Sequence, residues 1–99
     1  MFLVIDKLKN KNIIITGSTE GLGKYLSIEL SKYTSKLIMI SRSEKKLKIV
    51  RDKCFNKSKH IICPIDLNNI IEIKSNLKKH LKSIKRIDAV LHIAGGGLG

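Results

Sequence analysis

The sequence predicts an α/β fold built on a parallel sheet, with its elements in the order β-α-β-α-β-α-β. Two observations support this prediction. Short apolar runs, rich in β-branched residues, alternate with segments in which apolar residues recur at helical spacing. Helical segments of about 10–15 residues between strands are typical of parallel sheets, because a parallel neighbour is reached only through a crossover. The length of 99 residues is that of one domain.

The first strand and the first helix are predicted from residues 12–33. The strand covers Asn12–Thr16, whose unbroken apolar run is typical of a strand buried on both faces. A helix is expected from about Leu22 to Tyr33, with one apolar stripe packed on the sheet. The stripe consists of Leu22, Leu26, Leu30 and Tyr33.

The second strand and helix are predicted from residues 37–54. Leu37–Ile40 is apolar throughout and is expected to form the strand. Ser43 is a typical N-cap residue, because its hydroxyl can accept a hydrogen bond from a backbone amide in the first turn of a helix. The helix that follows should bury Leu47, Val50 and Cys54, which recur at helical spacing.

The last three elements are predicted from residues 60–93. His60–Ile65 is the third strand, in which Pro64 fits only near the end. Asn68 or Asn69 can cap the third helix. The apolar stripe of this helix consists of Ile70, Ile73, Leu77, Leu81 and Ile84. Ile87–Ile93 is the fourth strand, and a run of glycines follows it.

A glycine-rich turn joins the first strand to the first helix. Its sequence, Thr16-Gly17-Ser18-Thr19-Glu20-Gly21-Leu22-Gly23, has the spacing Gly-x-x-x-Gly-x-Gly. Such a turn inside a βαβ unit indicates dinucleotide binding. Gly17 would allow the tight turn, Gly21 would let the backbone approach a pyrophosphate, and Gly23 would let helix and strand pack closely. The alternative is a plain strand–helix turn, which seldom needs three glycines at this spacing.

These residues resemble a known family, the short-chain dehydrogenases/reductases, which have a Rossmann-type fold. The family pattern T-G-x-x-x-G-[IL]-G is matched at every fixed position by residues 16–23. Ile40–Leu47 is similar to the family segment xxRxxxKL, and Ile65-Asp66-Leu67 resembles the D-[VL] that binds adenine. Asp88–Gly95 is similar to D-x-L-V-N-N-A-G. The resemblance covers essentially the whole chain.

The resemblance implies a cofactor site at the carboxyl ends of the strands, and residues 1–99 would be the N-terminal NAD(P)-binding part of such an enzyme. The cofactor-binding residues would be Gly17, Ser18, Thr19, Glu20, Gly21, Leu22, Gly23, Ser41, Arg42, Asp66, Leu67, Ala94 and Gly95. No metal site is implied.

The residues at the end of the second strand favour NADP(H) over NAD(H). NAD-preferring sites usually place an acid about 20 residues after the glycines, where it binds the ribose 2′-hydroxyl. This chain has Ser41-Arg42 there, and a cation can hold a 2′-phosphate. Alternatively, Arg42 is a solvated surface residue paired with Glu44. Glu20 argues in the other direction, because some NADP-using members carry a basic residue at that position.

Two further positions leave alternatives open. Asp66 would accept a hydrogen bond from the adenine amino group while the Leu67 amide donates one, or Asp66 would act as a local cap before the third helix. His92 and Ile93 stand where the family has two asparagines. His92 could donate a hydrogen bond in the same place, or serve only the structure. His60 and His80 are interpreted as ordinary strand-end and helix-surface residues.

The family's catalytic pattern is absent from the printed sequence. Family members transfer hydride between nicotinamide and a carbonyl or alcohol carbon, using a Ser and a Tyr-x-x-x-Lys pair. Here Tyr25 is followed four residues later by Glu29, and Tyr33 by Leu37. We therefore expect no catalytic residue in this chain and a sheet that is incomplete at its C-terminal end. The complete protein would act on a small carbonyl or hydroxyl substrate as a homo-oligomer.

The net charge of +12 suggests a second function, a basic nucleotide- or RNA-binding module without catalysis. A third is a regulator that senses the cofactor or dimerises through the sheet. Seventeen of the 20 basic residues are Lys, and aromatic residues make up 4% of the chain. Base readers favour Arg and single-strand binders need stacking aromatics, so no specific nucleic acid is expected. The abundance of Lys, Ile and Asn is typical of an AT-rich gene.

Two features of the sequence indicate the cellular compartment of the protein, namely its cysteines and its N-terminal residues. Cys54 and Cys63 lack the spacing of metal ligands and are expected to be buried thiols in a reducing compartment. The apolar stretch Met1–Ile5 is too short for a signal peptide or a membrane span. We therefore expect a soluble cytoplasmic protein.

Overall fold

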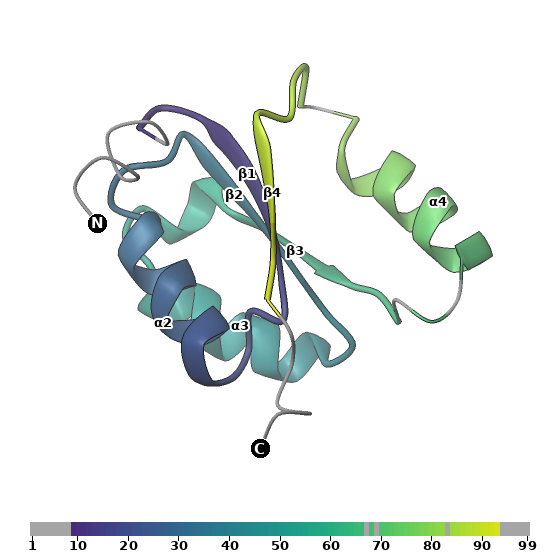
Figure 1. Ribbon diagram of the computed structural model, residues 1–99, viewed down its shortest axis with the longest axis horizontal. Coiled ribbons are helices and arrows are strands. Elements are labelled where there is room, and N and C mark those ends of the chain that lie inside the picture. Colours follow the sequence, from purple (N-terminus) through teal and green to yellow (C-terminus); the bar gives the residue numbers. More distant parts are fainter. Residues whose placement is uncertain (1–8, 67, 69, 83, 94–99) are drawn as a thin grey trace.

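A computed structural model describes residues 9–66, 68, 70–82 and 84–93, and its centre is a four-stranded parallel sheet (Figure 1). The strands are β1 (Asn12–Thr16), β2 (Lys36–Ser41), β3 (Ile61–Pro64) and β4 (Ala89–His92), in the order β3-β2-β1-β4. The helices are α2 (Gly21–Leu30), α3 (Glu44–Lys53) and α4 (Ile70–His80), and a short 3-10 helix, η1 (Lys57–Lys59), follows α3. The predicted α/β class and Rossmann-type order of elements are confirmed.

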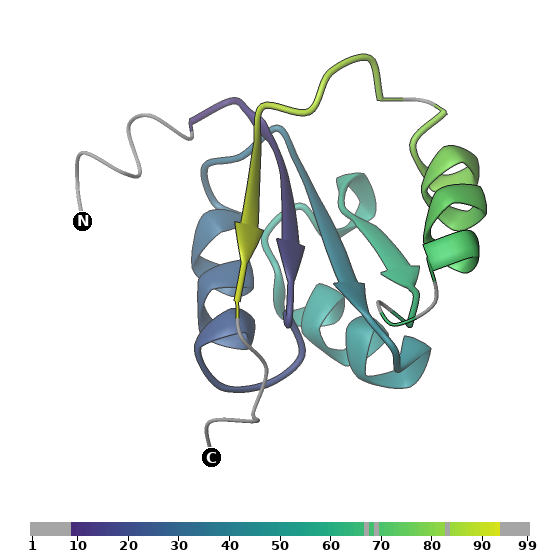
Figure 2. The same cartoon turned by 45° about the vertical axis from the view of Figure 1, so that its right-hand side comes forward.

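Helices cover both faces of the sheet. α2 and α3 lie on one face, and α4 lies on the other (Figure 2). Alternate residues of β1 serve the two faces, because successive side chains of a strand point in opposite directions. Ile13 and Ile15 belong to the cluster with α2 and α3, whereas Ile14 belongs to the cluster beneath α4. This two-sided burial explains the unbroken apolar run of β1.

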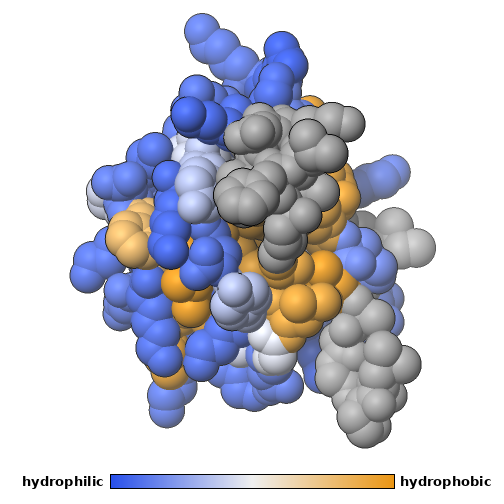
Figure 3. All heavy atoms as spheres, turned by 60° about the vertical axis from the view of Figure 1, so that its left-hand side comes forward, coloured by the Kyte–Doolittle hydropathy of each residue, from blue (hydrophilic) through white to orange (hydrophobic). Residues whose placement is uncertain are grey.

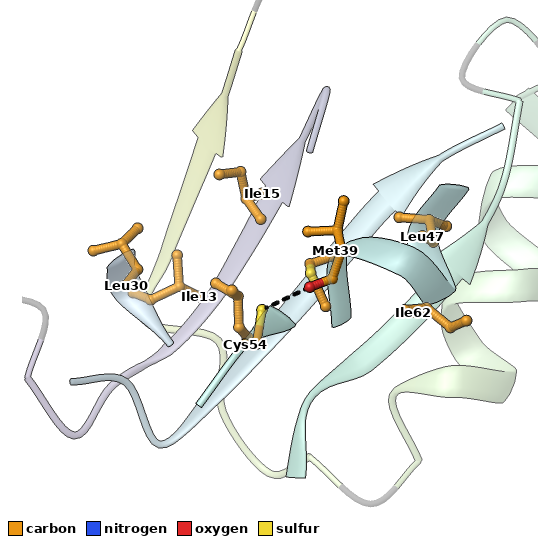
Figure 4. Packing of buried hydrophobic residues seen from close by; sticks show 9 residues of the cluster. Ile13, Ile15, Leu30, Met39, Leu47, Cys54 and Ile62 are labelled. Carbon is orange, nitrogen blue, oxygen red and sulfur yellow. Dashed lines mark hydrogen bonds between the residues drawn. The ribbon is translucent and has the colours of Figure 1, made fainter. Parts of the chain in front are cut away.

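The core beneath α2 and α3 confirms the stripe predicted for the second helix. Its buried members come from three strands, both helices and the residue after α3 (Figure 4): Ile13, Ile15, Leu30, Leu37, Met39, Leu47, Val50, Cys54 and Ile62. The predicted N-cap is also present, since the Ser43 hydroxyl accepts a hydrogen bond from the Lys46 amide at 3.2 Å.

The apolar stripe predicted for the first helix is confirmed only in part, since Leu30 is buried in the core and Leu26 packs against it. Leu22 is 61% exposed, and α2 ends at Leu30, before Tyr33. The buried residues of α2 are Gly23, Ser27 and Leu30. Within this face the Ser27 hydroxyl donates a hydrogen bond to the Gly23 carbonyl at 2.7 Å. Gly23 occupies the first buried position because the start of α2 lies too close to the Gly17 carbonyl for a side chain.

The second core lies between the sheet and α4. Its buried residues are Ile14, Ile38, Ile40, Cys63 and Ile65, with Leu77, Leu81 and Ile84 packed against them. This confirms the C-terminal half of the stripe predicted for the third helix; the side chains of Ile70 and Ile73 lie outside the described part. Both cysteines are free and buried, as predicted. Burial raises the pKa of both thiols, and that of Cys63 reaches about 11.

Some hydrophobic side chains remain on the surface. Figure 3 shows one face on which hydrophobic surface lies open between hydrophilic side chains. Within the described sheet β4 is an edge strand, and its residue Val90 is 59% exposed. None of the helices in the described part has the length and apolarity needed to cross a membrane.

His60 connects β2 to the segment after α3, a role that the sequence analysis missed. It is buried, and its Nδ1 accepts a hydrogen bond from the Leu37 amide at 3.1 Å. Its Nε2 lies 2.7 Å from the Phe55 carbonyl oxygen, to which it donates. Only the neutral ring with its proton on Nε2 makes both bonds. Burial, and to a smaller extent the Lys59 charge, lower the pKa of His60, although the bond to Phe55 opposes them.

We expect the protein to lose stability at acid pH through His60. An unfolded histidine titrates near pH 6.5 and the folded His60 titrates lower, so its contribution is complete above pH 6.5 and is lost as the pH falls below that value. Each pH unit in that window should lower the free energy of unfolding by at most about 1.4 kcal/mol. Urea unfolding at pH 7.5 and 5.5 measures the loss.

His60→Gln should abolish most of this pH dependence, whereas the control His80→Gln on α4 should retain it. An equal loss of stability at pH 5.5 in both variants would contradict the assignment to His60.

Candidate functional site

The four strands end together at one edge of the sheet. The register pairs Thr16 of β1 with Ile40 of β2 and with His92 of β4, and it pairs Ser41 with Pro64 of β3. The residues at these strand ends surround a cleft of about 310 Å³, lined by Thr16, Gly17, Ile40, Ser41, Arg42, Ile65, Asp66, Asn68, His92 and Ile93. Ligands of open parallel sheets usually bind at this edge.

A second cavity shares part of its wall with the cleft. It has a volume of about 230 Å³ and is lined by Gly17, Thr19, Glu20, Ser41, Arg42, Ser43 and Lys46. We call it the side cavity. Gly17, Ser41 and Arg42 line both spaces, so the end of β2 and the start of the glycine turn stand between them.

Two glycines of the turn allow close backbone contacts, Gly17 with the end of β4 and Gly23 with the end of β1. Gly17 has φ +67°, and a Cβ on it would lie 2.5 Å from the Ile93 carbonyl oxygen. A Cβ on Gly23 would lie 1.8 Å from the Gly17 carbonyl oxygen. Any larger residue at either position would have to move backbone atoms. The two positions therefore need glycine for space, and Gly17 also needs it for its conformation.

The third glycine faces open space. Gly21 has φ +51°, and nothing lies within 4 Å of the place where its Cβ would be. The preceding residue, Glu20, is the N-cap of α2 and makes no side-chain capping bond. The first backbone amides of α2 therefore receive no hydrogen bond from the Glu20 side chain, and the space in front of Gly21 is open. This arrangement fits an anionic group such as a pyrophosphate.

Two side chains fix the turn against β2. The Ser18 hydroxyl is buried and donates to the Ile40 carbonyl at 3.5 Å, and the Thr19 hydroxyl lies 3.3 Å from that of Ser41. Thr19 lines the side cavity, but the side chain of Ser18 lies behind the turn, and that of Leu22 points to solvent. Any contact of Ser18 with a ligand would come from its backbone.

Charged side chains gather around the side cavity. Arg42 is exposed and lines both spaces. Arg42 does not form the alternative pair with Glu44, whose Oε1 lies 4.0 Å from Lys48 Nζ instead. No other acidic side chain in the described part of the chain forms an ion pair with Arg42. Glu20 pairs with Lys46 at 2.7 Å. The hydrogen bond from Lys46 lowers the pKa of Glu20 below its usual value.

The ends of β3 and β4 complete the cleft. Asp66 accepts a hydrogen bond from the Asn68 amide at 2.9 Å, so it does stabilise the turn before α4. His92 Nδ1 lies 2.7 Å from the Thr16 hydroxyl and ties β4 to β1. His92 thus makes the structural contact that the sequence left as one of two alternatives. Leu67, Ala94 and Gly95 lie outside the described residues.

Sequence reasoning missed Lys46, Ser43 and Thr16 as residues of the cavity walls. For Lys46 a signal existed: it lies in the first turn of a helix, where the helix dipole disfavours a cation. Glu44 already supplies an anion in the same turn, and Glu20 supplies a second one from outside the helix. The pairing itself spans 26 residues of sequence and depends on the fold.

The chain is similar in sequence to known proteins of one family. A family model described as short chain dehydrogenase matches residues 11–98. The chain is 27% identical over 92 residues to "11-beta-hydroxysteroid dehydrogenase-like 4A" of Arabidopsis thaliana, covering 91% of this chain and 31% of that protein. It is 32% identical over 106 residues to "3-ketodihydrosphingosine reductase" of Dictyostelium discoideum, covering 90% and 32%.

A solved structure of a short chain dehydrogenase from Bacillus anthracis has a similar fold. The TM-score is 0.78 at 24% identity, and the match covers 90% of this chain and 36% of that one. The chain therefore spans about a third of the length of the relatives it matches.

The turn makes a testable prediction about its glycines. Gly23→Ala should lower the free energy of unfolding by about 3 kcal/mol, because its Cβ would overlap the Gly17 carbonyl. Gly21→Ala should cost only about 1 kcal/mol, since its positive φ disfavours Ala but its surroundings are open. Urea unfolding of both variants measures the difference. Equal costs, or a greater cost at Gly21, would contradict this description of the turn.

Proposed function

The chain belongs to the short-chain dehydrogenase family, and on that premise we propose that residues 1–99 form the NADP(H)-binding part of an oxidoreductase. The whole protein would interconvert a carbonyl and a hydroxyl group. The observation that carries this proposal is the glycine turn, in which Gly17 lines both cavities together with Arg42 and Gly21 faces open space. When bound, the dinucleotide would supply the hydride.

The pyrophosphate of the cofactor would lie over the glycine turn. The backbone of Gly17 and Gly21 would approach it, and the first amides of α2 would donate to its oxygens. This is supported by the empty space in front of Gly21 and by the missing side-chain cap at Glu20.

The adenine would lie in the cleft between the ends of β2 and β3. Ile40 and Ile65 provide apolar wall there, and Asp66 provides a carboxylate. Asp66 already accepts one hydrogen bond from Asn68, but a carboxylate can accept about four, so Asp66 can also accept one from the adenine amino group. Contacts from Leu67, Ala94 and Gly95 are proposed from the family resemblance alone.

Arg42 would hold the 2′-phosphate and favour NADP(H). No acid follows β2 at the position where NAD-preferring sites bind the 2′-hydroxyl, and Ser41 and Arg42 stand there instead. Arg42 is exposed at the cavity walls and is not engaged by any acidic side chain in the described part of the chain. A planar guanidinium can bind a phosphate through two parallel hydrogen bonds.

We propose that the proton transfer is carried out by residues outside this chain. No tyrosine of the printed sequence is followed four residues later by lysine, and the chain spans about a third of its relatives. The substrate would be a small molecule with a carbonyl or hydroxyl group. The names of the two relatives also refer to such groups, a hydroxysteroid in one and a ketodihydrosphingosine in the other. A cytoplasmic homo-oligomer remains our expectation for the whole protein.

Exchanging Arg42 tests the cofactor preference. The protein should bind NADPH at least about tenfold more tightly than NADH, because one charge-assisted contact is worth that factor. Arg42→Asp should reverse the order, since the acid repels the 2′-phosphate and accepts from the 2′-hydroxyl. Titration of the nucleotides' fluorescence measures both affinities.

Arg51→Asp is the matched control, because it makes the same charge change in the last turn of α3, away from both cavities. It should retain the preference for NADPH. Equal affinities for the two nucleotides, before and after Arg42→Asp, would overturn the NADP(H) assignment.

A further inference from the structure

We propose that Lys46 is a second residue that determines specificity for the 2′-phosphate, and that Glu20 holds Lys46 at the side cavity until a phosphate replaces the carboxylate. This inference rests on the proposed function, because it needs a nucleotide with a 2′-phosphate. It adds a second cation to the subsite and gives Glu20 a role opposed to phosphate binding.

The first observation is the position of the Glu20–Lys46 pair. Both residues line the side cavity together with Arg42, Ser41 and Ser43. Lys46 Nζ lies 2.7 Å from Glu20 Oε1, although the two side chains are 56% and 62% exposed. Lys46 belongs to the first turn of α3, and Glu20 is the N-cap of α2. The pair therefore bridges the beginnings of two helices across the wall of the cavity.

The second observation is the charge around the side cavity. Two of its lining residues, Arg42 and Lys46, are cations, and one, Glu20, is an anion. A phosphate monoester carries about −1.5 to −2 charges at pH 7 and offers three acceptor oxygens. It would attract both cations and repel the carboxylate. Glu20 and the phosphate therefore compete for the same ammonium group.

The competition should favour the phosphate. An ion pair as exposed as this one contributes little to stability, so Lys46 can leave Glu20 at small cost. A charge-assisted bond to a phosphate that is also held by Arg42 is stronger. The lysine side chain is flexible enough to change partner, whereas Arg42 needs no such exchange.

The position of Lys46 in α3 supports the same conclusion. The Lys46 amide donates to the Ser43 hydroxyl, which fixes the residue in the first helical turn. A cation is unfavourable there because it faces the positive end of the helix dipole. An anion near the ammonium group compensates for this, and Glu20 and the phosphate would do so in turn.

Nucleotide fragments isolate the subsite without any catalysis. The probes are adenosine 2′,5′-bisphosphate and adenosine 5′-monophosphate, which differ only in the 2′-phosphate. Isothermal titration calorimetry on the protein gives the ratio of their dissociation constants. Lys46→Met should lower the preference for the 2′-phosphate about tenfold by removing one charge-assisted contact. Glu20→Gln should raise it about threefold by removing the competitor.

Lys48→Met is the matched control, because Lys48 lies on the same helix and pairs with Glu44 outside the side cavity. It should leave the ratio unchanged, and circular dichroism should show the same helix content in every variant. If Lys46→Met leaves the ratio of dissociation constants as unchanged as Lys48→Met does, this inference is overturned. The role proposed for Arg42 is not affected by that result. A protein without any preference for the 2′-phosphate would instead overturn the proposed function, and this inference with it.

Discussion

The close approach of the first helix to the first strand is the constraint on which the rest of the structure depends. The backbone of Gly23 lies so near the Gly17 carbonyl that a Cβ would come within 1.8 Å of it. Because of this contact, the buried face of α2 begins with Gly23, which Ser27 and Leu30 follow, and Leu22 is left in solvent. The same contact brings the start of α2 to the edge of the sheet, where Gly21 faces open space.

Parallel pairing then brings together residues that are far apart in sequence. All four strands run in one direction, so the segments after β1, β2, β3 and β4 meet at one edge. Among the many cations of this chain, only Arg42 and Lys46 line the described cavities. The net charge of +12 is therefore mostly a property of the solvated surface, and we propose that only these two cations determine specificity.

The sequence predicts the parts of the fold that depend on local pattern. The apolar runs predict the four strands, and the Ser43 cap and the burial of Leu47 and Val50 follow from residue type and spacing. The stripe predicted for α2 holds for Leu26 and Leu30 and fails at Leu22, because a periodicity argument gives leucines more weight than small residues such as Gly23. It is the tertiary contact at Gly23 that decides which face is buried.

The sequence also predicts the part of the candidate site that depends on local pattern, but not the contacts between distant residues. The glycine spacing and the position of Arg42 mark the cavity edge in the sequence itself. The Glu20–Lys46 pair and the bond between His60 and Leu37 join residues 26 and 23 positions apart, so only the folded chain reveals them. Asp66 was predicted to bind the ligand, and in the fold it also accepts a hydrogen bond from the nearby Asn68 amide.

The central claim is that this chain binds a dinucleotide at the glycine turn and at the end of β2. Amide chemical shifts of the ¹⁵N-labelled protein, followed by nuclear magnetic resonance during titration with NADPH, test it most directly. The account predicts saturable shifts concentrated at Gly17, Gly21 and Arg42, with the lysines of α4 unaffected. Weak shifts spread over the lysine-rich surface, with none at the glycine turn, would contradict it.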